Sequence, residues 1–374
     1  MNILVVFTFG YSLKTWSDSK TLDREIAIYK HLHQQKGINF TFLTYGSNFD
    51  NELFDHDGLN VIPIYQFLNV TQSKYKMLFH SIIFPFRYKY MFKDIDIIKQ
   101  HQISGIWLSV ILKLLTKKPL YTRTGYDMHL FSKFENKNMF KRIFYYICNQ
   151  IGLIFSDIFT VSNSFDFENT KKRYLFTKNI YKRTNWIIKQ TYNPFERRHN
   201  NIVVSVGRIE KQKNFFELIE NFSNSNFEIH IFGNGSLEDE LQKYAKEHQV
   251  KLTLFGSVPN DVLQKKLSNY KYFVSTSIYE GNPKSVMEAL ALGCLVLASD
   301  IPNHKDLITD NKNGLLFELG SRDLNKKFFS VAEKNSKLTE ISKNAYEESV
   351  KNYELSFIAT KEFEDYILLL NQSR

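Results

Sequence analysis

The sequence predicts an α/β protein with two doubly wound, Rossmann-like domains that face each other across a cleft. Its 374 residues accommodate about two domains of ordinary size. Strand-like apolar runs alternate with helix-like patterns, which favours parallel sheets. The alternation stops at a polar stretch, residues 190–201, and starts again after it. Because ligands bind beyond the carboxyl ends of parallel strands, we expect the functional site in the cleft.

The first half begins with a buried-type strand over Asn2–Thr8, which ends at Gly10. A helix follows over Thr21–Gln35, since Leu22 and Ile26 recur on one helical face. The later elements predicted for this half are strands Ile38–Thr44, Leu59–Ile64 and one within Ile95–Lys99, helix Gly105–Leu115, strand Pro119–Thr124, helix Phe140–Ser156 and strand Asp157–Val161.

The charge balance changes at the same place as the pattern. Residues 1–190 hold 26 Lys/Arg against 14 Asp/Glu, and residues 191–374 hold 23 against 25. We therefore place domains at 1–190 and 200–374, with a last helix, about 353–371, that can pack back on the first domain. The second half is predicted as strand Ile202–Val206, helix Asn214–Asn221, strand Phe227–Phe232, helix Leu237–His248, strand Lys251–Phe255, helix Asn260–Leu267, strand Tyr272–Ser275, helix Pro283–Leu292, strand Leu295–Ala298 and helices within Asp323–Leu370.

Composition excludes several classes of protein. With 43% apolar and 24% charged residues, the chain is neither disordered nor fibrous. No run of 18 apolar residues predicts a membrane span, and the N-terminus lacks the basic start and cleavage site of a signal peptide. Cys148 and Cys294 lie far apart in apolar sequence, so we expect buried thiols in a reducing, cytoplasmic compartment.

The basic first half favours anionic partners. Within it, residues Lys74–Lys93 alternate basic, aromatic and large apolar residues. Such a segment can lie on an anionic bilayer surface, and Pro85 is expected to divide it into two short helices. The alternative is a pair of core helices with a solvated basic edge.

The strongest chemical signal lies within residues 280–288. Pro283 suits the first position of a helix, and Asn282 can cap that helix. The amides of Lys284 and Ser285 would then form an anion site, with the positive end of the helix dipole behind them. The alternative is an ordinary capped helix.

Glu288 follows in the same helix and is the only charge within Val286–Gly293. A carboxylate among apolar residues needs hydrogen-bond donors. A ribose diol could supply them, although an acidic residue near a helix start is also favoured by the dipole alone.

A second signal follows the first strand of the second half. Gly207 ends the strand, Arg208 opens the loop and Lys213 closes it, and both cations suit phosphate groups. Asn214 can cap the next helix, with Glu217 reaching back as in a capping box. Surface charge in a loop is the alternative interpretation. Two weaker signals are Gly10 and Gly233-Asn234-Gly235, for which a tight turn is the default.

These residues together resemble the retaining, two-Rossmann glycosyltransferases of family 4, in the group that builds bacterial surface polysaccharides. Glu280 and Glu288, with seven residues between them, are similar to the paired glutamates of that family. Gly207-Arg208 with Lys213 is similar to its diphosphate-binding pair. The resemblance covers residues 200–320 strongly and includes the Gly-Asn-Gly turn and Val258 of Phe255-Gly256-Ser257-Val258-Pro259.

The first half matches less closely, through residues 8–32 and Arg123-Thr124-Gly125-Tyr126-Asp127. Many members carry a histidine after the fifth strand that contacts the donor sugar. This sequence has no histidine within Tyr121–Gly125, and the glycine-rich loop after the first strand is reduced to Gly10.

The resemblance implies a GT-B enzyme that moves a sugar from a UDP- or GDP-sugar to a glycan or lipid-linked acceptor, with retention and without a metal or other cofactor. Lipopolysaccharide or capsule synthesis in the cytoplasm, on the inner face of the cytoplasmic membrane, is the implied setting. The implied catalytic residues are Arg208, Lys213 and Glu280. The implied substrate-binding residues are Gly10, Arg123, Asp127, Gly207, Arg208, Lys213, Gly233, Val258, Glu280, Asn282, Pro283, Lys284, Ser285 and Glu288.

Two other classes are weighed against this interpretation. A nucleotide-sugar epimerase on the same paired fold would need carboxylates that act as acid and base near the sugar. A nucleic-acid-binding protein would need aromatic residues in exposed basic strands. The aromatic residues here stand in apolar runs, so we expect no nucleic acid partner.

Overall fold

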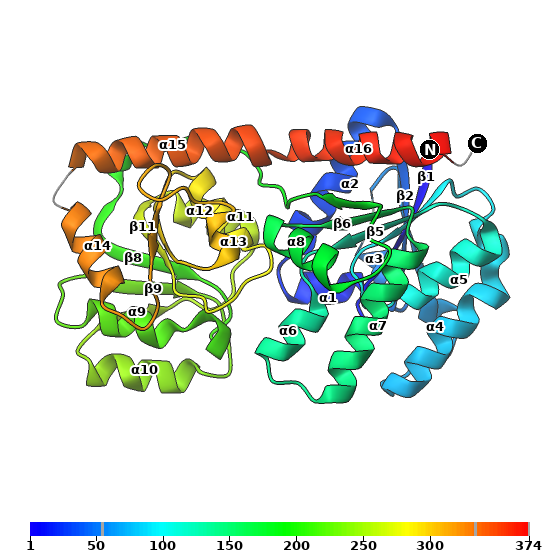
Figure 1. The fold of residues 1–374 in the computed structure, drawn as a ribbon, viewed down its shortest axis with the longest axis horizontal. Helices are drawn as coiled ribbons and strands as arrows, with labels where there is room; N and C mark the ends of the chain where they lie inside the picture. Colours follow the sequence, from blue (N-terminus) through cyan, green and yellow to red (C-terminus); the bar gives the residue numbers. More distant parts are fainter. Residues whose placement is uncertain (54–55, 333–334, 373–374) are drawn as a thin grey trace. The chain divides into compact units, whose positions relative to one another are not determined.

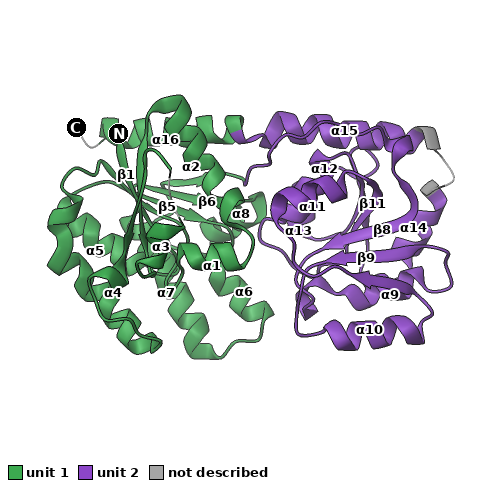
Figure 2. Cartoon of the chain, turned by 180° about the vertical axis from the view of Figure 1, so that it is seen from behind, with its two compact units in different colours: residues 1–184, 356–374 green, residues 185–355 purple. Residues whose placement is uncertain are grey.

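In a computed structural model, which describes residues 1–53, 56–332 and 335–372, the chain divides into two compact units. Figure 2 shows the first unit, residues 1–184 and 356–374, and the second, residues 185–355. The division falls just before the polar stretch at 190–201. The helix that follows the second unit in sequence belongs to the first, so the first unit is built from two separate pieces of chain.

The first unit contains a seven-stranded parallel sheet of order β3-β2-β1-β4-β5-β6-β7. Its core strands are buried on both faces, as expected where helices cover both sides of a parallel sheet. The strands are β1 (Asn2–Val6), β2 (Asn39–Thr44), β3 (Leu59–Pro63), β4 (Ile97–Gln100), β5 (Leu120–Thr124), β6 (Ile158–Val161) and β7 (Ile180–Lys182).

The helices of this unit form two layers (Figure 1). On one face, α4, α5 and α7 pack against Leu4, Leu120 and neighbouring side chains. On the other, Tyr29 of α2 packs on Phe40, and Tyr366 of α16 packs on Tyr121. The helices are α1 (Leu13–Asp18), α2 (Leu22–Lys36), α3 (Phe49–Glu52), η1 (Ile64–Gln66), α4 (Lys74–Tyr88), η2 (Lys89–Phe92), α5 (Ile106–Thr116), α6 (Met128–Phe134), α7 (Met139–Phe155), α8 (Ser164–Arg173) and α16 (Leu355–Gln372).

The division of residues Lys74–Lys93 at Pro85 is wrong. α4 runs as one helix through Pro85, and a 3₁₀ turn follows it. A proline removes one helical hydrogen bond, here the one to the carbonyl of Ser81. Pro85 and Phe84 are buried in the unit, so packing holds the helix together across the proline.

The second unit contains a six-stranded parallel sheet of order β10-β9-β8-β11-β12-β13. Alternate side chains enter two cores: Val203 and Val274 on one face, and Val204 and Phe273 on the other. The two sheets confirm the predicted fold class. The strands are β8 (His199–Val206), β9 (Glu228–Phe232), β10 (Lys251–Leu254), β11 (Tyr270–Ser275), β12 (Leu295–Ser299) and β13 (Leu315–Phe317).

The helices of the second unit cover both faces of its sheet. Leu218 of α9 and Phe328 of α14 enter one core, and Leu263 of α11 and Leu290 of α12 enter the other. The helices are η3 (Phe195–Arg197), η4 (Lys211–Lys213), α9 (Phe215–Phe222), α10 (Glu238–Glu247), α11 (Asn260–Leu267), α12 (Lys284–Ala291), α13 (Pro302–Lys305), α14 (Asp323–Ala332) and α15 (Asn335–Tyr353). Within the predicted helical stretch at 323–370, residues 333–334 lie outside the described residues.

Two expectations from composition concern the cysteines and the absence of a membrane span. Cys148 and Cys294 are free and buried, as predicted. In the part of the chain that is described, no helix is long and apolar enough to cross a membrane.

Candidate active site

The strand order of the second unit reverses between β8 and β11, which run side by side. After β8 the next strands, β9 and β10, lie toward one edge of the sheet, and after β11 the strands β12 and β13 lie toward the other. Such a reversal leaves a crevice at the carboxyl ends of the two strands, where α/β proteins bind ligands. Here the loops after β8 and β11 are joined. The Ile278 amide donates to the Gln212 carbonyl (2.9 Å), Gln212 Nε2 donates to the Tyr279 carbonyl (2.8 Å), and Thr276 Oγ1 donates to the Lys213 carbonyl (2.7 Å).

These loops bring together two of the predicted catalytic residues. Lys213 Nζ donates to Glu280 Oε1, and Ser277 Oγ donates to the same oxygen at 2.6 Å. Burial alone would raise the pKa of Glu280. The charge of Lys213 and the hydrogen bonds from Lys213 and Ser277 outweigh it and hold this pKa below its usual value. Glu280 is therefore an ionised carboxylate paired with an ammonium group.

His304 lies behind this pair and was missed by the sequence analysis. It is fully buried, and burial lowers its pKa to about 4, so the ring is neutral at pH 7. His304 Nδ1 lies 2.8 Å from the Ser299 carbonyl, and Nε2 lies 3.4 Å from Ser275 Oγ. No motif marks it in the sequence; its only signal is its place just after a predicted strand.

The glycines after β8 and β9 allow two loops to touch. The Gly207 amide donates to the Phe232 carbonyl at 3.0 Å. A Cβ atom at Gly233 would lie 2.0 Å from the Gly207 carbonyl oxygen, and one at Gly235 would lie 2.1 Å from the Ile209 carbonyl oxygen. Close backbone approach, in addition to the turn itself, therefore requires glycine at 233 and 235.

The start of α12 differs from the prediction. The helix begins at Lys284, and Pro283 occupies the cap position, which no side chain caps. The Asn282 side chain does not cap the helix, because its Oδ1 instead accepts a hydrogen bond from Asn185 Nδ2 at 3.0 Å. Lys284 and the half-buried Ser285 remain the first two residues of the helix, with Lys284 Nζ 5.4 Å from the ring centre of Trp186.

Glu288 is buried in the second turn of α12. Glu288 was expected to bind a ribose because a carboxylate among apolar residues needs hydrogen-bond donors. The protein itself supplies one donor, since Asn260 Nδ2 donates to Glu288 Oε1 at 3.1 Å. Asn260 begins α11 two residues after Val258, so the loop after β10 lies beside Glu288. Glu288 and Glu280 thus have different partners.

Arg208 is exposed and donates to Gln212 Oε1 at 3.4 Å. The predicted capping box after it is wrong. Asn214 has a left-handed backbone (φ 51°), which turns its side chain away from the helix amides. Its Nδ2 donates to Glu217 Oε2 at 2.7 Å, while Glu217 Oε1 accepts from the Gly320 amide at 2.8 Å.

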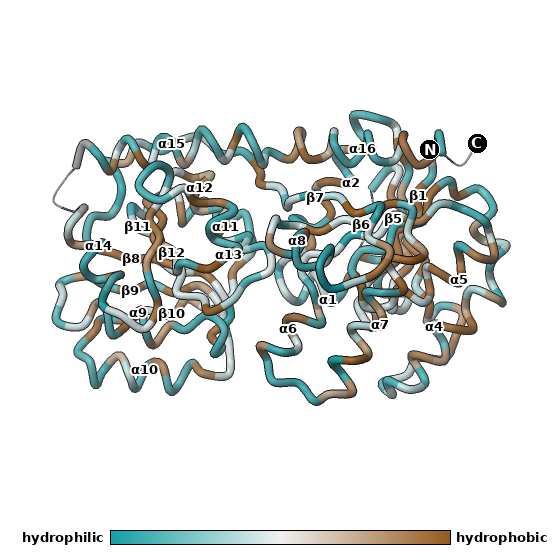
Figure 3. The backbone as a smooth tube through the Cα atoms, viewed as in Figure 1, coloured by the Kyte–Doolittle hydropathy of each residue, from teal (hydrophilic) through white to brown (hydrophobic). Residues whose placement is uncertain are grey.

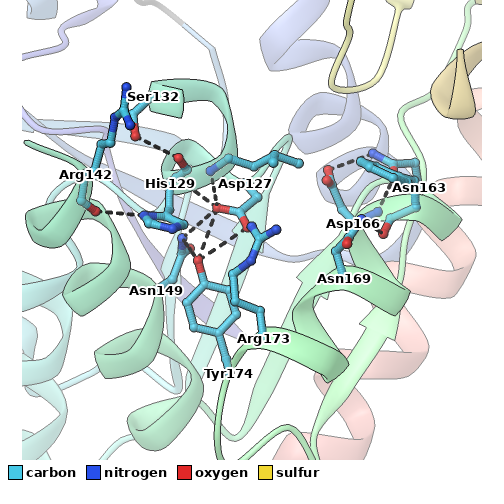
Figure 4. Close-up of polar contacts among 12 residues, drawn as sticks. Asp127, His129, Ser132, Arg142, Asn149, Asn163, Asp166, Asn169, Arg173 and Tyr174 are labelled. Atoms are coloured by element: carbon cyan, nitrogen blue, oxygen red, sulfur yellow. Dashed lines mark hydrogen bonds and ion pairs between the residues drawn. The ribbon is translucent and has the colours of Figure 1, made fainter. Parts of the chain in front are cut away.

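The candidates in the first unit have structural partners. Figure 4 shows Asp127 at the centre of a buried network, where it caps α6. Its carboxylate accepts from the His129 amide (2.8 Å), Asn149 Nδ2 (3.1 Å), Arg173 (3.0 Å) and Tyr174 (3.2 Å). These bonds occupy both oxygens of Asp127.

Arg123 is buried within β5, and Gly10 is exposed after β1 with a left-handed backbone (φ 79°). Beside the Asp127 network, burial raises the pKa of Asp166 to about 7. Among the described side chains, no group of three or more His, Cys, Asp or Glu is arranged to hold a metal ion.

Comparison with known proteins matches the second half of the chain to one family model, and parts of the chain to several glycosyltransferases. Residues 189–348 match the family described as glycosyl transferases group 1. A poly(ribitol-phosphate) alpha-N-acetylglucosaminyltransferase of Staphylococcus aureus is 28% identical over 217 residues, which are 58% of this chain and 40% of that protein. A lipopolysaccharide 1,6-galactosyltransferase of Salmonella typhimurium is 30% identical over 139 residues, 35% of this chain and 39% of that protein. The matches thus span less than half the length of these relatives.

Solved structures resemble the chain over its whole length. The structure of Anabaena Alr3699/HepE in complex with UDP and glucose has a TM-score of 0.76 at 14% identity, covering 98% of this chain and 99% of that one. The TarM structure has a TM-score of 0.78 at 14% identity, covering 99% of each. At these identities the likeness establishes the fold alone, which is of the GT-B type.

Proposed function

Because residues 189–348 match the family described as glycosyl transferases group 1, we propose that the protein transfers a sugar from a nucleotide-diphosphosugar to an acceptor in surface polysaccharide synthesis. The observation that carries this proposal is the joining of Lys213, Ser277 and Glu280 at the reversal of strand order. An ammonium group held at that edge of the sheet suits the diphosphate of a donor.

In the proposed reaction, the bond between the anomeric carbon and the diphosphate breaks, and the acceptor hydroxyl forms the new bond on the same face. The hydroxyl proton passes to the departing diphosphate. Lys213 and Arg208 stabilise the negative charge that develops on this leaving group. Glu280 holds Lys213 in place and orients donor hydroxyls. The step includes no metal ion, and turnover is expected to persist in excess chelator.

The remaining donor contacts follow from α12 and its surroundings. The first amides of α12, at Lys284 and Ser285, face a diphosphate with the positive end of the helix dipole. Glu288 accepts hydrogen bonds from the ribose hydroxyls beside its bond from Asn260. UDP- and GDP-sugars are the proposed donors; a solved structure of similar fold, bound to UDP and glucose, supports the first of these.

The proposed acceptor is a glycan or a lipid-linked glycan. One relative, from Campylobacter jejuni, is named as acting on a diphospho-undecaprenol-linked sugar, which supports a lipid-linked acceptor. We place the reaction in the cytoplasm, at the inner face of the cytoplasmic membrane.

The test is a thermal-shift screen of the intact protein against UDP- and GDP-sugars, followed by turnover of the best donor with and without candidate lipid-linked acceptors. Binding stabilises the folded state by mass action, about 2.7 kcal/mol at 100 times Kd. Donor consumption that depends on the acceptor and yields a glycosylated product supports transfer. Formation of an epimer of the donor, or stabilisation by no nucleotide sugar, would contradict it.

A further inference from the structure

Three neighbouring helices of the first unit carry no acidic residue. α4, α5 and α7 hold Lys and Arg but neither Asp nor Glu. They pack in one layer, with α5 in contact with both others (Figure 1). Trp107 of α5 links them, because its Nε1 donates to Ser81 Oγ of α4 at 2.8 Å and its ring lies 5.9 Å from that of Phe144 of α7.

The outer helices of this layer expose an apolar stripe. Both repeat large apolar residues every three or four positions, the spacing of one helical face, and Figure 3 shows apolar residues along both. An apolar helical face usually packs on the core. In these two helices the core is instead contacted from other faces, by Phe84 of α4 and Cys148 of α7. The stripe residues, which are exposed, are Tyr75, Phe79, Ile82 and Phe86 on α4, and Phe140, Ile143, Ile147 and Ile154 on α7.

This exposure is concentrated in the layer. Of the 25 exposed large apolar side chains in the described part of the chain, 11 lie on these three helices. Phe79 is 60% exposed and Phe140 is 85% exposed. The alternative of two core helices with a solvated edge therefore does not hold for the stripe residues on Lys74–Lys93. Monomeric proteins rarely leave such a patch without a partner.

We propose that the outer face of α4, α5 and α7 docks on a bilayer that contains anionic phospholipid. The apolar stripes would enter the boundary between headgroups and acyl chains, and Lys74, Lys76 and Lys141 would contact the lipid phosphates. A second copy of the chain would bring a face of the same positive charge. A nucleic acid would pair with the lysines but would leave aliphatic residues such as Ile143 and Ile147 exposed.

The experiment uses the full chain and sedimentation with vesicles of phosphatidylcholine alone or of phosphatidylcholine with phosphatidylglycerol. We expect binding to the anionic vesicles that weakens with added salt, and little binding to the neutral ones. The double variant Phe79→Ser with Phe140→Ser should weaken binding to the anionic vesicles by about tenfold or more, because burial of apolar side chains drives insertion. Lys76→Glu with Lys141→Glu should weaken it by more than about thirtyfold, because the loss of two lysines alone accounts for that factor and the new glutamates repel the lipid phosphates.

Two matched controls separate docking from general effects. Phe357→Ser with Leu368→Ser removes exposed apolar groups from α16, and Lys243→Glu with Lys343→Glu reverses exposed lysines of the second unit. Both should bind anionic vesicles like the unchanged protein. Equal binding to neutral and anionic vesicles, no binding to either, or equal losses in the controls would overturn the proposal. So would a dimer in sedimentation velocity that Phe140→Ser dissociates while vesicle binding is absent.

Discussion

Lys99 with Glu362 in the first unit and Lys213 with Glu280 in the second are both lysine–glutamate pairs with little exposure to solvent. Their side chains are 1% and 5% exposed in the first pair and 15% and 9% in the second. The first pair lies between a strand, β4, and α16; the second joins loops that follow two strands. Burial of an ion pair therefore does not mark a functional site, whereas its place at the carboxyl ends of the strands does.

The two lysine–glutamate pairs also differ in the side chains that surround them. Tyr366 donates to Glu362, and Lys99 Nζ lies 4.6 Å from the ring centre of Tyr29, so aromatic side chains enclose the first pair. Burial lowers the pKa of Lys99. Burial would raise the pKa of Glu362, but the charge of Lys99 and the hydrogen bonds from Lys99 and Tyr366 together outweigh it and hold this pKa below its usual value. The first pair holds a helix on a sheet, and the second links two loops at the carboxyl ends of strands.

The largest expected effect is on stability, from Glu362→Ala. Removing one partner of a buried pair leaves the other charge unpaired, which costs about 3–5 kcal/mol. Urea unfolding followed by circular dichroism measures it. The double change Lys99→Met with Glu362→Leu removes both charges and should recover most of the loss. If Glu362→Ala lowers the free energy of unfolding by less than about 1 kcal/mol, the first pair does not have the structural role that distinguishes it from the second.

Lys213→Ala is expected to act on turnover more than on stability. Loss of one group that stabilises developing charge lowers kcat by about 10²–10³-fold. Arg208→Ala should lower turnover as well, with a stability change within about 0.5 kcal/mol because Arg208 is exposed. If both cations act on one diphosphate, the effects of the double variant are not additive. Full turnover in the double variant would exclude both from the reaction.

Acid should destabilise the second unit through His304. Its folded pKa of about 4 lies below the ordinary 6.5, so between these values the unfolded chain binds a proton that the folded chain does not. Stability therefore falls as pH drops through this window, by up to about 3 kcal/mol. Glu280, whose pKa is also lowered, adds a loss at the acid end. Melting temperatures of the wild type and His304→Gln from pH 7 to 4 test this; parallel curves would contradict it.

Glu288→Ala should weaken donor binding while the fold persists. Loss of a charged hydrogen bond to the ribose costs about 1.5–3 kcal/mol, measured by calorimetric titration of the donor. Asn260→Ala, which removes the hydrogen bond from Asn260 Nδ2 but keeps the carboxylate of Glu288, serves as the control and should change binding less. Unchanged affinity in Glu288→Ala would show that the ribose lies elsewhere.

The sequence predicted the two sheets and the loops of the site because both depend on local patterns. Continuous apolar runs mark strands buried on both faces, and Gly207 and Pro283 mark the loops that follow them. The capping roles of Asn282 and Asn214 were wrong, because distant partners or a left-handed backbone redirect these side chains. Asn185, which binds Asn282, lies 97 residues away.

Several other features of the structure could not be predicted from the sequence, because they depend on contacts between distant residues or on very short segments. His304 has no motif, and its neutral state depends on burial that only the folded unit creates. The strand β7 and the edge strand β13 have three residues each, too few to give a periodic pattern. For Lys74–Lys93 the sequence left a bilayer surface and core helices as alternatives, and it assigned no face to the helix at 140–156; only the structure places the apolar stripes of α4 and α7 in solvent.

The membership of α16 in the first unit has a consequence for the order of synthesis. Proteins are made from the N-terminus, and domains generally fold as they emerge from the ribosome. Residues 1–184 emerge first, but Lys99 gains its carboxylate partner only after residues 185–355 have been made. The unit that starts first is thus completed last, and until Glu362 arrives a nascent chain holds an unpaired lysine where α16 will later cover the sheet.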